Sequence, residues 1–400
     1  MNERIKSYKG TITVETPVHI GDGHIVNKKD YIYDGAHKQV QIIDIPKLYM
    51  QLCPTLQEKF EYFYSGDRSD LQGWLETNLN WSNKSQYENF IKSSMTSGTS
   101  IAVKDRGGYK LCEIRSFIKD PYNRPYVPGS SIKGLLRSAL LSQVLHEHGD
   151  EYQNEISGLL NKAFDSEKVS VKKFLKPEIK KLENAVFNSW LYQKRQGFKN
   201  VRDRDDGVNC CLSGLIVGDS AGVESDKLIV VQKIDEEPKG ERRPLPIFRE
   251  CLKPETKIEF MLTINSGLCP FTLEYIEKSL KTYFADQVRG FYKKFIDGMS
   301  IDSGCHAFLG GGVGFFSKTV TEVISETGVR KSVLEINDRI FFHTLSRFDR
   351  RSRKPLYKIH KHNLDKDKFM VSPHMRKRTR YQDRYVDMGR ISLTFEEIEI

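Results

Sequence analysis

The chain has 400 residues, of which 38% are hydrophobic and 29% charged. At about 150 residues per domain, this length allows roughly two or three domains, and the composition excludes a wholly disordered chain and a small disulfide-held protein. The formal net charge of +10 favours an acidic partner, with nucleic acid ahead of a membrane surface. All of that surplus lies in residues 347–380, which carry 13 Lys and Arg against 3 Asp and Glu.

Neither a membrane nor a metal is expected as a partner. No apolar stretch reaches the roughly 18 residues of a spanning helix, and residues 1–10 lack the apolar core of a secretion signal. The seven cysteines are odd in number, and none has the spacing of a zinc site. This pattern favours free thiols in a reducing compartment, so we expect a cytoplasmic protein.

Helical and extended patterns alternate along the chain. Alternating apolar residues predict a strand over residues 5–14, and Asp34-Gly35 predicts the turn of a strand pair over residues 31–45. Helical spacing predicts two inserted helical lobes, near residues 46–95 and 152–199. Further strands are expected at 214–218, 228–234 and 257–264, and a long helix at 271–296. The order of these elements predicts an α+β fold with mixed or antiparallel sheets.

A helix that follows Pro128-Gly129 is a candidate phosphate site. Ser130 or Ser131 is a suitable N-cap, and the free N–H groups of a helix N-terminus favour phosphate. Lys133 and Arg137 are four residues apart, so they share a helix face and could hold adjacent phosphates. The residues alone leave a capped, solvated surface helix as an equal alternative.

A glycine run, Leu309-Gly-Gly-Gly-Val-Gly314, is the second candidate. It fits neither the dinucleotide pattern nor the Walker pattern, so no nucleotide cofactor is predicted. Gly310, Gly311, Gly312 and Gly314 still permit positive φ angles and close backbone approach, which suits a loop lying against a polynucleotide. A tight connector between elements explains the run equally well.

The basic segment 347–380 is the third candidate, with Arg350, Arg351, Arg353 and Lys354 at its most basic point. Interleaved aromatic residues could stack on bases while the cations meet phosphates. Charge runs are usually solvated tails, but an apolar strand at 390–398 follows this one. We therefore expect a long loop within the fold that contacts nucleic acid.

Candidates for catalysis are few. His19 could act as the general base of a metal-independent ribonuclease, although most unplaced histidines are surface residues. No constellation of metal-binding residues or nucleophile elbow is visible, so neither a metal nor another cofactor is predicted. The residues therefore favour a binding protein over an enzyme, but they leave the enzyme as an open alternative.

Three motifs taken in order resemble a known family. Thr16-Pro-Val-His-Ile-Gly21, Pro128-Gly-Ser-Ser-Ile-Lys-Gly-Leu-Leu-Arg137 and the glycine run 309–314 are similar to signatures of the RAMP superfamily of CRISPR-associated proteins. The length, the inserted lobes and the basic end are most similar to the fifth Csm subunit of type III-A effector complexes. The resemblance covers almost the whole chain.

The resemblance implies two ferredoxin-like, RRM-type domains, at residues 1–225 and 226–400. It implies a prokaryotic, non-catalytic subunit that binds and caps the 3′ end of the CRISPR RNA and supports its maturation and complex assembly in antiviral defence. The implied partners are the adjacent RAMP backbone subunit and the small subunit, with target RNA and host nucleases as further ones. The alternative is a metal-independent endoribonuclease that processes CRISPR repeat RNA. The implied RNA-binding residues are Ser130, Ser131, Lys133, Arg137, Gly310, Gly311, Gly312 and Gly314, with Arg350, Arg351, Arg353 and Lys354 added from the basic segment.

Overall fold

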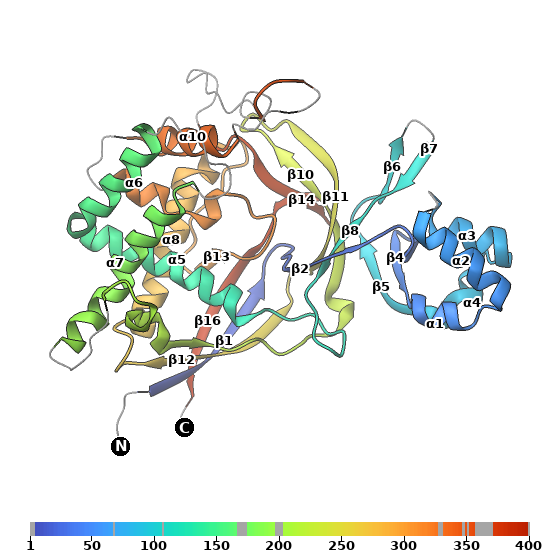
Figure 1. The fold of residues 1–400 in the computed structure, drawn as a ribbon, viewed down its shortest axis with the longest axis horizontal. Helices are drawn as coiled ribbons and strands as arrows, with labels where there is room; N and C mark the ends of the chain where they lie inside the picture. Colours follow the sequence, from blue (N-terminus) through green and yellow to red (C-terminus); the bar gives the residue numbers. More distant parts are fainter. Residues whose placement is uncertain are drawn as a thin grey trace.

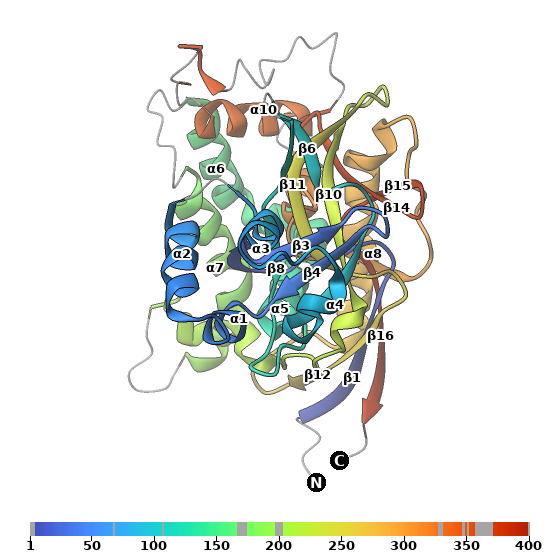
Figure 2. The same ribbon diagram turned by 90° about the vertical axis from the view of Figure 1, so that its right-hand side faces the viewer.

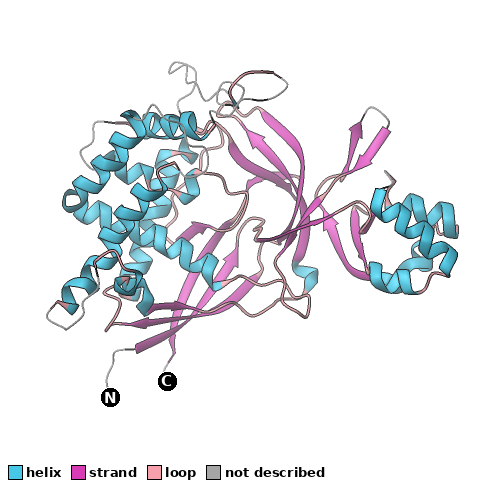
Figure 3. Cartoon of the chain, in the orientation of Figure 1, coloured by secondary structure: helices cyan, strands magenta, loops and turns pink. Residues whose placement is uncertain are grey.

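A computed structural model of the chain describes residues 5–66, 69–105, 108–165, 174–196, 203–326, 331–345, 349, 352–356 and 371–398. Two β-sheets form the middle of the molecule, with a larger group of helices on one side and a smaller group on the other (Figures 1 and 3). The expected α+β class is confirmed. In the described part of the chain, no helix is both long and apolar enough to cross a membrane.

The first sheet contains five antiparallel strands in the order β13-β16-β1-β12-β9. Its members are β1 (Ile5–Val14), β9 (Leu215–Val217), β12 (Lys257–Asn265), β13 (Cys305–Phe308) and β16 (Arg390–Ile398). The predicted alternation of β1 is confirmed, because Ile12 and Val14 are buried. Both strands that flank β1 come from the second half of the chain.

The second sheet follows the order β2-β8-β11-β10-β5-β4-β3, and β14 and β15 join it at β10. Its members are β2 (Gly21–Val26), β3 (Tyr31–Asp34), β4 (Gln39–Ile43), β5 (Ile91–Ser97), β8 (Ile114–Phe117), β10 (Leu228–Glu236), β11 (Arg242–Leu252), β14 (Arg376–Tyr381) and β15 (Arg384–Asp387). The hairpin predicted at Asp34-Gly35 joins β3 to β4. A separate pair is formed by β6 (Ala102–Asp105) and β7 (Gly108–Leu111).

The two sheets mix strands from both halves of the sequence. β1 pairs with β12 and β16, and β10 and β11 pair with β5 and β8. The division into domains at residue 225 stays a prediction.

The helices form two groups. At the right of Figure 1, α1 (Ile45–Met50), α2 (Pro54–Gly66), α3 (Leu71–Leu79) and α4 (Lys84–Tyr87) enclose a small core of their own around Phe60, Phe63 and Trp74. The helical lobe expected at 46–95 is therefore present, but its last residues belong to β5, because Met95 and Ser97 are buried in alternation.

The larger helical group covers the first sheet (Figure 2). It contains α5 (Gly129–His148), α6 (Gln153–Asp165), α7 (Lys176–Arg195), α8 (Leu273–Gly290), α9 (Thr321–Glu326) and α10 (Val333–Thr344). α5 packs against α8, and α8 packs against β13. The described part of the second expected lobe consists of α6 and α7. The helix expected at 271–296 is shorter and ends at Gly290.

Candidate nucleic-acid interface

A cavity of about 370 Å³ lies where the three sequence motifs meet. Ile20 and Gly21 belong to the first motif, Ser130 and Ser131 begin α5, and Gly310 and Gly311 belong to the glycine run. The remaining lining residues are Gly134, Leu135, Ser138, Tyr283, Phe308, Leu309, Ser317 and Lys318. Segments almost 300 positions apart in the sequence thus form one concave surface.

The start of α5 is fixed by close backbone packing. A side chain on Gly129 would overlap the carbonyl oxygens of Val217 and Gly218, so only glycine fits there. The Gly129 N–H donates to Asp219 Oδ1 at 2.7 Å. The expectation of a serine N-cap is wrong: the helix begins at Gly129 after Pro128, and the two serines lie within its first turn and line the cavity. The first N–H of α5 is therefore already hydrogen-bonded to the carboxylate of Asp219.

Lys133 and Arg137 lie on another face of α5, outside the cavity lining. Arg137 Nη2 donates to Glu183 Oε2 of α7 at 2.6 Å, and its guanidinium stacks 5.1 Å from the Phe187 ring centre. Arg137 therefore joins two helices, and contact between either side chain and RNA stays a prediction.

Lys318 is the basic residue that the sequence reasoning missed. It lines the cavity, and no carboxylate pairs with its ammonium among the residues that the structure describes. Partial burial lowers its pKa. Its position four residues after Gly314 could have indicated a basic residue beside the glycine run, although the segment does not fit the Walker pattern.

The glycine run has the backbone that only glycine adopts readily. Gly310, Gly312 and Gly314 have φ angles of +90°, +88° and +97°. Any side chain at Gly310 would overlap the carbonyl oxygen of His19, to which the Gly311 N–H donates at 2.6 Å. The loop is therefore held against the first motif, as a binding loop of fixed shape requires.

His19 anchors this loop from within. Its side chain is 5% exposed, and Nδ1 lies 2.7 Å from the Glu250 carbonyl oxygen. A carbonyl only accepts, so Nδ1 carries the proton and donates. Burial, with the positive Arg249 and Arg115 nearby, lowers the His19 pKa to about 4. This imidazole is neutral near pH 7 and is hydrogen-bonded within the fold, and a catalytic role for His19 stays a prediction.

The His19 pKa predicts a loss of stability in weak acid. The unfolded chain binds the His19 proton near pH 6.5 and the folded chain only near pH 4, so between these values the unfolded state holds more protons. The free energy of unfolding should therefore fall as the pH falls through this window, by up to about 3 kcal/mol from His19. Urea unfolding of the wild type and His19→Asn at several pH values checks this: the variant should lose less stability, and equal slopes would contradict it.

The basic segment is only partly described. Arg350 and Arg351 lie outside the described residues, whereas Arg353 and Lys354 lie in an exposed turn and do not line the cavity. Their contact with RNA stays a prediction.

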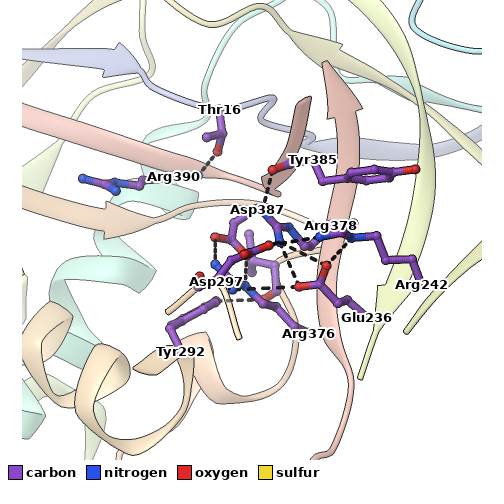
Figure 4. Close-up of polar contacts among 11 residues, drawn as sticks. Thr16, Glu236, Arg242, Tyr292, Asp297, Arg376, Arg378, Tyr385, Asp387 and Arg390 are labelled. Atoms are coloured by element: carbon purple, nitrogen blue, oxygen red, sulfur yellow. Dashed lines mark hydrogen bonds and ion pairs between the residues drawn. The ribbon is translucent and has the colours of Figure 1, made fainter. Parts of the chain in front are cut away.

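The end of the basic segment belongs to the interior. In β14, Arg376 is held by Asp387 through two hydrogen bonds of 2.5 Å, and its side chain is 3% exposed (Figure 4). Arg378 Nη1 donates to Glu236 Oε1 at 2.8 Å, and that carboxylate is fully buried. Arg242 also contacts Glu236, from β11. The expectation of one long loop over the whole segment is wrong here, because Arg376 and Arg378 lie in strand β14, where Asp387 of β15 and Glu236 of β10 neutralise them.

No group of three or more His, Cys, Asp or Glu suited to a metal occurs in the described ranges. The cavity offers hydroxyls, backbone groups and one ammonium, which are donors for phosphate oxygens.

The sequence of the chain is similar to those of known proteins. A model of the RAMP superfamily matches residues 11–317. The CRISPR system Cms protein Csm5 of Mycobacterium tuberculosis (strain CDC 1551 / Oshkosh) is 26% identical over the full length of both chains. The protein of that name from Streptococcus thermophilus is 26% identical, covering 80% of this chain and 82% of its own.

Two solved structures share the fold. One is a chain of a cryo-EM structure of a Csm–crRNA–target RNA ternary complex of a type III-A CRISPR-Cas system, with a TM-score of 0.57 and 18% identity over 97% of this chain and all of that chain. The other is the crystal structure of T. onnurineus Csm5, with a TM-score of 0.55 and 21% identity over 80% of this chain and 94% of that one.

Proposed function

Because the chain belongs to the RAMP superfamily, we propose that it serves as a Csm5-like subunit of a type III-A CRISPR effector complex in the prokaryotic cytoplasm. In this role it binds the CRISPR RNA at the cavity between α5 and the glycine run. Relatives named Csm5 along the full length of the chain support the proposal. A fold shared with a chain of a Csm–crRNA–target RNA complex agrees with it.

The convergence of the three motifs carries the proposal. Residues of all three motifs line one cavity, and the groups there are hydroxyls, glycine backbone and the ammonium of Lys318, which has no carboxylate partner among the described residues. Such donors bind phosphate and sugar oxygens and read no base sequence. One guide-binding subunit must accept every spacer sequence, which matches this kind of contact.

We also propose which end of the CRISPR RNA the protein binds. The resemblance to the fifth Csm subunit supports a contact with the 3′ part of the CRISPR RNA, with the RAMP backbone subunit and the small subunit as proposed neighbours. A photo-crosslinker at Ser131 in the reconstituted complex tests this. Cross-links should map to the 3′ part of the guide for several spacer sequences, and cross-links concentrated at the 5′ end would contradict it.

Charge reversal at Lys318 tests RNA binding itself. Lys318→Glu should weaken the binding of single-stranded RNA about tenfold or more, alike for all sequences, because a phosphate contact is replaced by repulsion. If about five phosphates are neutralised, the wild-type slope of log affinity against log salt is about −3.5. The matched control is Lys59→Glu, which makes the same charge change on the exposed face of α2. Affinity independent of salt would overturn the proposal.

The wild-type protein also tests the alternative that the chain is an endoribonuclease. If our proposal is correct, labelled repeat RNA incubated with the wild-type protein in the presence of a metal chelator should stay intact. Defined products that vanish in His19→Asn would support the enzyme instead.

A further inference from the structure

Two arginines lie side by side in the second sheet, outside the cavity. Arg249 of β11 is the register partner of Arg115 in the neighbouring parallel strand β8. Like charges at directly opposed positions of a sheet repel each other and destabilise it. Their presence therefore calls for a compensating anion.

The structure supplies no such anion from within the described residues. Arg249 is only 6% exposed, its Nη1 has no hydrogen-bond partner, and neither guanidinium pairs with a carboxylate there. Burial and the charge of Arg115 lower the pKa of Arg249, which shows that its cationic form is poorly solvated. A buried, unpaired cation is unfavourable, whereas elsewhere in this fold buried arginines have partners.

Two acids of this region, Asp235 and Asp22, already have partners of their own. Asp235 pairs with Lys233 at 3.1 Å and with Lys377 at 3.0 Å. Asp22 accepts from the Ser116 hydroxyl and the His24 N–H. The site therefore retains a positive surplus.

Arg249 lies beside the glycine run, outside the cavity lining. A Cβ on Gly312 would lie 3.2 Å from Arg249 Nη1. The guanidinium thus lies directly against the loop. Arg115 is exposed, so an anion can approach from solvent.

We propose that Arg249 and Arg115 bind a backbone phosphate of RNA on the β11 side of the glycine run, as a second contact distinct from the cavity at Ser130 and Ser131. A guanidinium presents a planar fork that matches phosphate oxygens. Two neighbouring guanidinium groups beside the glycine run suit a phosphate group, and the proposed RNA-binding cavity lies at the same loop. The inference rests on the proposed function, since the RNA would contact this loop at two places.

Arg249→Met is the decisive variant, because it keeps the side-chain length and removes the charge. The free protein should unfold at the same or a higher temperature than the wild type, because an uncompensated buried charge is gone. Affinity for a labelled single-stranded RNA of mixed sequence should fall about tenfold, and the salt slope should become shallower by about 0.7. Arg243→Met is the matched control, since it removes the same charge from the half-exposed start of β11 and should leave RNA affinity within twofold.

The outcomes separate the two proposals. A lower unfolding temperature for Arg249→Met with unchanged RNA affinity would make Arg249 a structural residue and overturn the inference. So would a polyglutamate peptide that binds the wild type as tightly as RNA does and loses binding in the variant. If Lys318→Glu weakens RNA binding and Arg249→Met does not, only this inference fails. If the wild type itself shows no salt-dependent RNA binding, the proposed function fails.

Discussion

Replacing Asp387 by alanine should lower the free energy of unfolding by about 3–5 kcal/mol, because the variant leaves the buried Arg376 without its carboxylate. Both side chains are less than a tenth exposed, and two hydrogen bonds join them. Arg376 Nη1 also donates to the Asp297 carbonyl, and its guanidinium stacks 5.5 Å from the Tyr292 ring centre (Figure 4). Denaturant unfolding at neutral pH measures the change.

Two further variants show whether charge burial is the cause. Glu397→Ala breaks an exposed pair with Lys6, in which both side chains are 52% exposed, and should change stability by less than about 1 kcal/mol. The double variant Arg376→Met, Asp387→Leu should recover much of the loss, since it removes both charges. A double variant as unstable as Asp387→Ala would contradict this explanation.

Gly310→Ala should both destabilise the protein and weaken RNA binding. The residue has a φ of +90°, which costs an alanine about 1–3 kcal/mol, and the new methyl group would also overlap the His19 carbonyl oxygen. The loop must then shift away from the first motif and deform the cavity. Unfolding in urea measures the first effect, and RNA affinity under conditions where the variant remains folded measures the second.

The matched control uses a glycine with open space around it. Gly158 lies within α6, and no atom lies within 4 Å of an added Cβ. Gly158→Ala should raise stability by about 0.5–1 kcal/mol and leave RNA affinity unchanged. Equal effects of the two substitutions would show that glycine conformation at 310 is not what shapes the loop.

Local patterns predicted the elements that follow a simple period. The alternation of β1, the turn at Asp34-Gly35 and the helix that follows Pro128-Gly129 all correspond to observed structure. β11 was missed, because Pro244 and Pro246 interrupt its first half. Proline removes a donor from the ladder, so it usually argues against a strand. Here Pro244 opposes Ile234 beside an irregularity of the β10–β11 pairing, where β11 has the extra residues and regular pairing is already relaxed.

The candidate site was predictable in its motifs but not in its charges. A four-residue spacing puts Lys133 and Arg137 on one helix face, yet it does not say which neighbour covers that face, and Glu183 lies there. Counting charges along residues 347–380 likewise hides the partners of Arg378, since Glu236 is 142 positions away. Lys318 lines the cavity and Arg249 lies beside Gly312 only because distant segments pack around the glycine run.

The place of β1 between β12 and β16 affects how the chain folds during synthesis. Ser7 is paired with Ile398, so one edge of β1 has no partner until the ribosome has synthesised β16. Contacts between such distant residues slow folding, and an unpaired strand edge can pair with other chains. A polypeptide truncated before residue 390 would retain the α5 and glycine-run motifs but expose that edge, so the pairing of β1 with β16, which lie side by side in Figures 1 and 2, forms late.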